Sequence, residues 1–101
     1  MLTHIVWWTM KDQAAGRNAA ENIALIKSML ESLPGRIPAL KDLTVGSNVL
    51  PASTEEAQLV LVTRHDDAEG LAQYAAHPEH QKVVALLKET TASRRAIDFI
   101  D

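Results

Sequence analysis

The side chains best suited to acid–base chemistry gather in one short motif and at the C-terminal end. Tyr74, His77 and His80 form a Tyr-x-x-His-Pro-x-His motif, and Asp98 follows later in the chain. A neutral imidazole, with a pKa of about 6.5, can remove a proton beside a carbonyl at neutral pH. A carboxylate bonded to the other ring nitrogen fixes the tautomer and stabilises the imidazolium. We therefore predict that His80 is a general base oriented by Asp98.

Three further side chains can support this base. The Tyr74 hydroxyl can donate to a carbonyl oxygen that gains negative charge, and His77 and His4 can add polar contacts in the same pocket. Each also has a structural interpretation. His80 and Asp98 can be a buried pair that joins helix to strand, since buried polar groups are normally paired. His77 can cap a helix junction, His4 can be a satisfied strand histidine, and Tyr74 can be a core aromatic with a bonded hydroxyl.

A metal site is the alternative interpretation of the histidines. His77 and His80 are three residues apart, and His4 or Asp98 would complete a His/Asp cluster. However, Pro78 between the two histidines would splay their rings apart. The chain also lacks a dense carboxylate cluster for a hard cation. The sequence therefore predicts neither a metal nor a cofactor.

Composition limits the class of protein. The 101 residues are 47% hydrophobic and 23% charged, which predicts one globular domain over residues 1–101. Cysteine is absent, which excludes disulfides and thiolate chemistry. A net charge of −3 without a strongly basic segment argues against nucleic-acid binding. The sequence shows no signal peptide and no membrane-length apolar run, so we expect a cytoplasmic protein that does not bind membranes.

The elements that must position these side chains follow a recognisable order. Strands are expected at residues 2–10, 40–49, 57–65 and 96–100. A helix is expected at residues 18–33, where apolar residues recur every three or four positions. A second helix begins near Asp66 or Asp67 and is broken at Pro78, where a further helix starts. The order β-α-β-β-α-β predicts an α+β, ferredoxin-like chain with an antiparallel sheet and helices on one face.

Alternation along the strands separates two faces of this sheet. Alternate positions of three strands would face the helices and line one cavity: His4, Val6, Trp8, Leu59, Leu61, Ala96 and Asp98. Of these, we expect His4, Val6, Trp8, Leu59 and Leu61, together with His77, to contact a substrate. The open face is apolar and carries Ile5, Trp7, Val60, Val62, Ile97 and Phe99. Such a patch is too apolar to leave in water, so we predict a homodimer through this open face.

Three pieces of sequence together resemble one family. They are His4-Ile5-Val6, the motif Tyr74 to His80, and Ile97-Asp98-Phe99. In this order and spacing they resemble the stress-responsive dimeric α/β-barrel (Dabb) family, over essentially the whole chain. The resemblance implies a ferredoxin-like protomer and a homodimer whose two sheets close a barrel. It also implies a pocket between sheet and helices.

The resemblance also suggests an activity. Members of the family include stress-associated proteins and plant polyketide cyclases of the olivetolic acid type. In those cyclases the tyrosine and second histidine of the motif act in cofactor-free aldol chemistry, and a strand aspartate orients that histidine. These positions correspond to Tyr74, His80 and Asp98. The cyclases keep a further histidine on the third strand where this chain has Leu59, so we expect a pocket of different shape and polarity.

Three functions are consistent with these observations. The first is a cofactor-independent cyclase, lyase or isomerase with His80 as base. The second is a non-catalytic, stress-related dimer that binds a small apolar or carbonyl-containing ligand or has a structural role. The third is a cofactor-free monooxygenase of a related dimeric barrel family. The scarcity of aromatic residues, 4% of the chain, weakens this third possibility.

Overall fold

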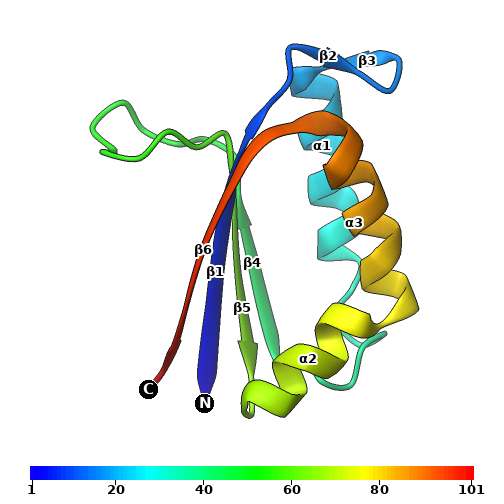
Figure 1. Cartoon of the computed structure of the whole chain (residues 1–101), viewed down its shortest axis with the longest axis vertical. Coiled ribbons are helices and arrows are strands. Elements are labelled where there is room, and N and C mark those ends of the chain that lie inside the picture. Colours follow the sequence, from blue (N-terminus) through cyan, green and yellow to red (C-terminus); the bar gives the residue numbers. More distant parts are fainter.

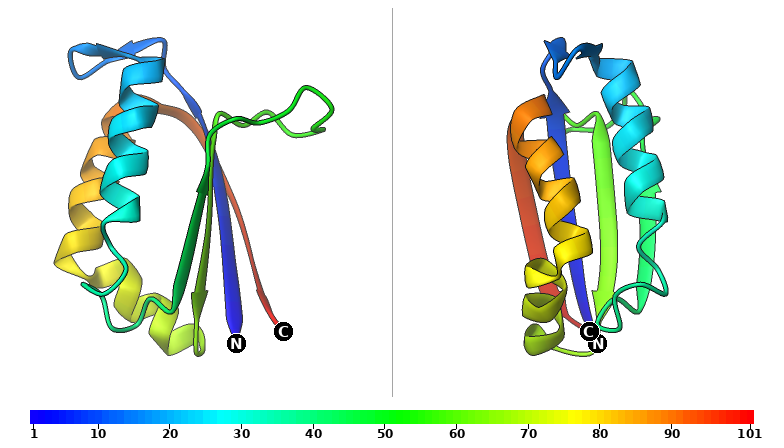
Figure 2. Two further views of the ribbon diagram at one scale, coloured as in Figure 1. Left: turned by 180° about the vertical axis from the view of Figure 1, so that it is seen from behind. Right: turned by 90° about the vertical axis from the view of Figure 1, so that its right-hand side faces the viewer.

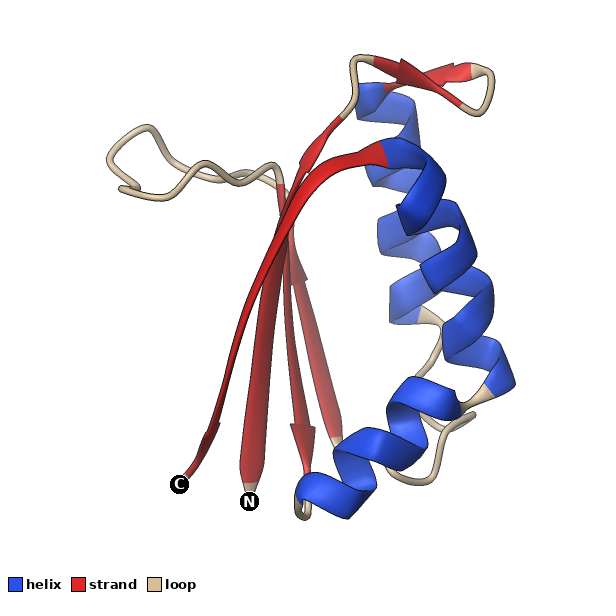
Figure 3. Cartoon of the chain, in the orientation of Figure 1, coloured by secondary structure: helices blue, strands red, loops and turns tan.

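A four-stranded antiparallel sheet forms one layer of the molecule, and three helices cover one of its faces (Figures 1 and 3). The computed structural model describes all residues, 1–101. The strand order is β4-β5-β1-β6, which confirms the ferredoxin-like prediction. The elements in chain order are β1 (Leu2–Met10), β2 (Gln13–Ala14), β3 (Arg17–Asn18), α1 (Ala19–Glu31), β4 (Asp42–Gly46), β5 (Leu59–His65), α2 (Ala68–Ala76), α3 (Pro78–Thr90) and β6 (Thr91–Ile100).

Each helix begins at a side chain that caps its free backbone N–H groups. Asn18 accepts from the Glu21 N–H in a capping box at the start of α1, and Asp67 accepts from the Gly70 N–H at the start of α2. At the start of α3, His77 accepts from Glu79 N–H while Pro78 fills the first helical position. No helix is both long and apolar enough to span a membrane.

Two local predictions are corrected. The expected loop at residues 11–17 contains a two-strand hairpin, β2 and β3, whose turn uses positive φ angles of 52° at Ala15 and 77° at Gly16. The last strand begins at Thr91, five residues before the predicted start at Ala96. Its first half is polar on both faces and exposed along an edge, so it lacks the apolar alternation by which strands are recognised.

The strand register confirms the predicted division into two faces. Residues directly opposite one another in an antiparallel pair share a face, and Ile5 lies opposite both Val62 and Ile97. On the open face, Ile97 and Phe99 remain 55% and 46% exposed. The loop between β4 and β5 projects to this open side, away from the helices (Figure 1 and Figure 2, left).

The helix-covered face has two unlike halves (Figure 2, right). α1 lies over β4 and β5, and the space between them is filled by fully buried residues such as Ile26 and Leu59. α3 lies over β1 and β6, but every residue of β6 after Thr91 is exposed. We call these the packed half and the hollow half.

Candidate functional site

The hollow half contains a cavity of about 440 Å³ between the sheet and helices α2 and α3. Its walls are mainly apolar, which suits a small organic ligand with a few polar anchoring points. The lining residues come from β1, β5, β6 and all three helices. They are His4, Val6, Trp8, Leu30, Leu61, Leu71, Tyr74, Ala75, His80, Val84, Leu87, Lys88, Thr91 and Arg94.

His80 lies in the first turn of α3 and lines the cavity. Its Nδ1 is 3.0 Å from the Ala75 carbonyl oxygen. Because a carbonyl oxygen can only accept, Nδ1 carries the hydrogen and Nε2 carries the free lone pair. Burial is the main cause that lowers the pKa of His80, and the charges of His4, Arg94 and His65 lower it further. The imidazole is therefore neutral at pH 7 and has one unused basic nitrogen.

Tyr74 lies beside His80, with ring centroids 4.3 Å apart. The residue is only 1% exposed, and its hydroxyl is buried without a hydrogen-bond partner in the chain. Burial raises the pKa of Tyr74, so the hydroxyl stays protonated. A buried donor without a partner lowers the stability of the fold. Tyr74 lines a cavity that can hold a ligand oxygen, which would accept this hydrogen bond. The arrangement of Tyr74 and His80 is thus a proton donor next to a proton acceptor.

The predicted pairing of His80 with Asp98 is wrong. Asp98 Oδ1 instead accepts a hydrogen bond from His4 Nδ1. The cause is the register, because β1 and β6 place His4 and Asp98 directly opposite each other on the helix-covered face. His80 is held by the Ala75 carbonyl of its own helical region, so a backbone group takes the orienting place predicted for the carboxylate. Asp98 does not line the cavity but holds a histidine that does.

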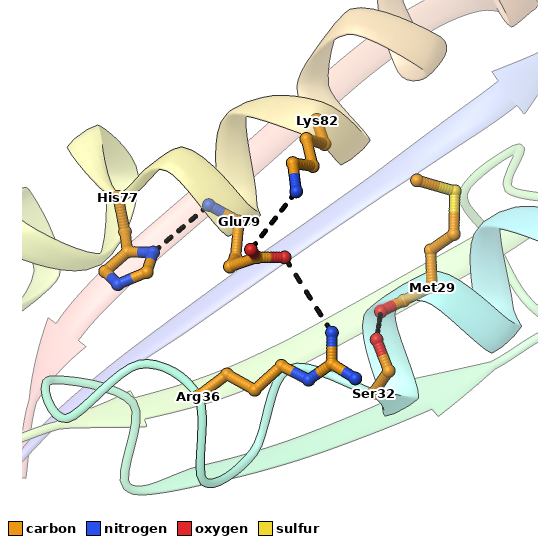
Figure 4. A network of polar contacts seen from close by, with 6 residues as sticks. All are labelled: Met29, Ser32, Arg36, His77, Glu79 and Lys82. Carbon is orange, nitrogen blue, oxygen red and sulfur yellow. Dashed lines mark hydrogen bonds and ion pairs between the residues drawn. The ribbon is translucent and has the colours of Figure 1, made fainter.

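Two predicted contact residues lie outside the cavity. Leu59 is fully buried in the packed half. Figure 4 shows His77 at the start of α3, where its Nδ1 accepts from the Glu79 N–H at 3.1 Å. Glu79 also forms ion pairs with Lys82 at 3.2 Å and Arg36 at 3.8 Å, which link α3 to the segment after α1. His77 is therefore a helix cap, as the structural interpretation holds. His4, Val6, Trp8 and Leu61 do line the cavity.

Sequence reasoning missed a polar end of the cavity. Lys88, Thr91 and Arg94 line it, and none was predicted. A helical stripe could have indicated Lys88, which lies eight residues after His80. Arg94 shares strand parity with Asp98 but lies before the strand start that was predicted. His, Asp and Glu side chains form no group of three or more that could hold a metal ion.

Comparison with known proteins identifies relatives of the whole chain. The profile of the family described as "Stress responsive A/B Barrel Domain" matches residues 2–101. A dimeric protein of unknown function and ferredoxin-like fold from Bacteroides fragilis superimposes with a TM-score of 0.86 at 28% identity, covering 99% of this chain and 95% of the other. No curated protein has a sequence that matches this chain.

Two more distant structures share the fold alone. A hydroxynitrile lyase from Passiflora edulis has a TM-score of 0.81 at 14% identity, covering 99% of this chain and 92% of the lyase. An antibiotic biosynthesis monooxygenase has a TM-score of 0.73 at 14% identity, covering 100% of this chain and 98% of that one. Proteins with this backbone fold therefore differ in their chemistry, so the function of this chain must be argued from the residues of its cavity.

Proposed function

The chain belongs to the stress-responsive A/B barrel (Dabb) family, and from this premise we propose that it performs cofactor-independent acid–base chemistry on a small carbonyl compound. His80 is the general base, and Tyr74 is the hydrogen-bond donor to the carbonyl oxygen. One observation carries the proposal. The Nδ1 of His80 is bound to a backbone carbonyl in a mainly apolar cavity, which leaves Nε2 basic beside a buried hydroxyl without a partner.

The proposed step is proton transfer from carbon. The C–H bond next to the carbonyl breaks, its proton passes to His80 Nε2, and its electron pair moves to the carbonyl oxygen as an enolate. Tyr74 donates to that oxygen, which would be worth several kcal/mol where water is excluded. The enolate can then attack a second carbonyl within the substrate or be reprotonated. Cyclases and isomerases share this first step.

The pair of His4 and Asp98 supports the same cavity from β1. With Nδ1 bound to Asp98, the Nε2 of His4 is free to contact a substrate oxygen or a water molecule. The ring of His80 packs against Tyr74, but the ring of His4 does not. We therefore assign the base to His80 and a substrate-binding role to His4.

Hydrogen–deuterium exchange tests the proposal without knowledge of the natural substrate. 2-Octanone is incubated with the protein in D₂O, and loss of its α-proton signals is followed by NMR. We expect exchange above the buffer background, reduced about 10²- to 10⁴-fold by His80→Gln, since this range is typical for loss of a general base. Tyr74→Phe should also reduce exchange, because it removes the donor and leaves the ring.

His77→Asn is the matched control. It changes a histidine three residues away that lies outside the cavity, and asparagine is an effective helix cap. Exchange by this variant should match the wild type. Equal exchange by wild type and His80→Gln, or loss of exchange in His4→Gln alone, would show that His80 is not the base. Binding of the ketone without exchange would favour the non-catalytic ligand-binding function.

The open sheet face supports a second proposal, that the protein is a homodimer through this face. Its exposed apolar residues, including Ile97 and Phe99, form a patch that a second copy would cover, and the related Bacteroides fragilis protein is described as dimeric. Trp7→Asp or Val62→Asp should therefore produce monomers or aggregates. An unchanged dimer mass in light scattering would contradict this interface.

A further inference from the structure

One end of the cavity carries two positive charges that have no partner within the chain. Lys88 and Arg94 both line the cavity. Neither takes part in an ion pair, although most other Lys and Arg side chains pair with a carboxylate or a backbone or side-chain acceptor. Lys27 on α1 also lacks such a partner, but it lies outside the cavity. The two unpaired cations of the cavity are therefore available to a ligand.

The fold directs both cations at one space. Along α3, His80, Val84 and Lys88 are spaced four residues apart, so they form one stripe that faces the cavity. On β6, Arg94 lies opposite Trp8, which is itself a lining residue. No carboxylate side chain lines the cavity to neutralise these charges. The helix wall and the strand wall thus each contribute one cation.

The opposite end of the cavity carries the reacting groups. Tyr74 there is 1% exposed, and its hydroxyl has no partner in the chain. The helical rise of 1.5 Å per residue separates the backbones of His80 and Lys88 by about 12 Å. Apolar lining residues such as Val84 and Leu87 lie between them. The cavity therefore has an anion-binding end, an apolar middle and a buried hydrogen-bond donor.

We propose that the ligand is a carbonyl compound with a carboxylate at its far end. Arg94 and Lys88 hold the carboxylate, and the carbonyl lies beside Tyr74 and His80. The planar guanidinium of Arg94 can donate two parallel hydrogen bonds to a carboxylate, and Lys88 adds a point charge. This inference rests on the proposed function, because it assigns the substrate class for the same cavity.

A matched pair of ligands tests the carboxylate. 7-Oxooctanoate and 2-octanone have the same methyl ketone and chain length and differ in the terminal carboxylate. Titration calorimetry at low ionic strength should show about tenfold tighter binding of the keto acid, which corresponds to about one charge-assisted contact. Arg94→Gln should remove most of this preference and Lys88→Gln a smaller part. Lys27→Gln, the control cation outside the cavity, should leave it unchanged.

Charge reversal separates recognition from general damage to the protein. The wild type should bind octanoate more tightly than octylammonium. Replacing both cations, in the double variant Arg94→Glu/Lys88→Glu, should reverse this order. A partly unfolded variant would lose both ligands and could not reverse the preference. Salt should weaken octanoate binding to the wild type, because the cations are exposed to solvent and screened.

The failure of this inference is distinct from failure of the proposed function. Equal binding of keto acid and ketone by the wild type, or an unchanged preference in Arg94→Gln, overturns the carboxylate assignment even if exchange proceeds. Conversely, His80→Gln should retain the preference for 7-oxooctanoate while it loses exchange. A protein that binds the keto acid more tightly and exchanges neither ligand would support the carboxylate assignment and contradict the base.

Discussion

His65 and His80 flank the ring of Tyr74 at centroid distances of 5.0 and 4.3 Å, but their hydrogen bonding differs. His65 uses both ring nitrogens, Nδ1 to the Ala39 carbonyl at 2.8 Å and Nε2 to the Thr63 hydroxyl at 2.9 Å. His80 uses only Nδ1. Burial lowers the pKa of both. A lowered pKa therefore does not distinguish the two, whereas an unused ring nitrogen on a residue that lines the cavity does, and this is why His65 is not proposed as the base.

The same contrast applies to the two halves of the helix-covered face. In the packed half, buried residues of α1 and of the strands beneath it, such as Ile26 and Leu59, belong to the hydrophobic core. In the hollow half, β6 contacts chiefly β1, and the space under α3 stays open. The packed half of the helix–sheet layer thus supplies stability, and the hollow half leaves a cavity that the proposed ligand would occupy.

The largest effect should come from cutting a side chain in the packed half. Leu59→Ala would leave a cavity in a fully buried site and should lower the free energy of unfolding by about 2–5 kcal/mol. Leu71→Ala, at the half-buried wall of the existing cavity, should cost only about 1 kcal/mol. Urea unfolding at one protein concentration measures the free energy of unfolding of both variants. Equal decreases in that free energy would mean that the two halves are packed alike.

Adding volume should give a smaller difference between neighbouring positions. Val83 is fully buried in the core, and Val84 lines the cavity. Val83→Phe should destabilise the protein by about 1–3 kcal/mol because a packed core resists added atoms. Val84→Phe can extend into open space and should cost less than about 1 kcal/mol while it weakens ligand binding. If Val84→Phe lowered the free energy of unfolding more than Val83→Phe does, the space beside Val84 would not be open.

Mild acid should destabilise the fold through His65 and His80. Their pKa values are lowered in the folded state, so the unfolded chain takes up protons first as the pH falls below about 6.5. The free energy of unfolding should therefore be highest above that pH and decrease below it. Urea unfolding between pH 5 and 7.5 measures this slope. If the free energy of unfolding of His80→Gln depends less on pH, part of the acid destabilisation comes from His80. A free energy of unfolding that increases in acid would contradict the lowered pKa values of the two histidines.

The smallest effect concerns the pH profile of proton exchange. His80 must be neutral to act as a base, so the rate should stay level down to a pH below about 6.5 and then decrease. Arg94→Gln removes a positive charge that contributes to the lowered pKa, so its acidic limb should move upward by less than about one pH unit. The rate of 2-octanone exchange against pH checks this, with Lys27→Gln as the control.

Most of the fold could be predicted because its signals are local. The stripe on α1, the cap at Asp67 and the alternation of β5 depend on neighbours in sequence. The start of β6 could not be predicted in this way, since an exposed edge strand needs no alternating pattern. The register of the sheet then determined which side chains meet.

The sequence placed Tyr74 and His80 together, but it did not give the hydrogen-bond partners of His80 and Asp98. Tyr74 and His80 each lie three residues from His77, the residue at the junction of α2 and α3, so the motif itself brings them together. The partner of Asp98 depends on the alignment of β1 with β6, which are separated by most of the chain. Arg94 was missed because it lies before the predicted start of the last strand, whereas the helical stripe from His80 could have indicated Lys88.

The junction between α3 and β6 has a consequence for how this protein can change. α3 ends at Thr90 and β6 begins at Thr91, so no loop residue separates the two elements. One added residue that shifted the pairing of β6 with β1 would move every later side chain to the opposite face of the sheet. Arg94 and Asp98 would exchange faces with Ile97 and Phe99, so the proposed carboxylate contact and the proposed dimer face would be lost in a single event. Insertions should therefore be tolerated better in the loop between β4 and β5 than at the junction of α3 and β6.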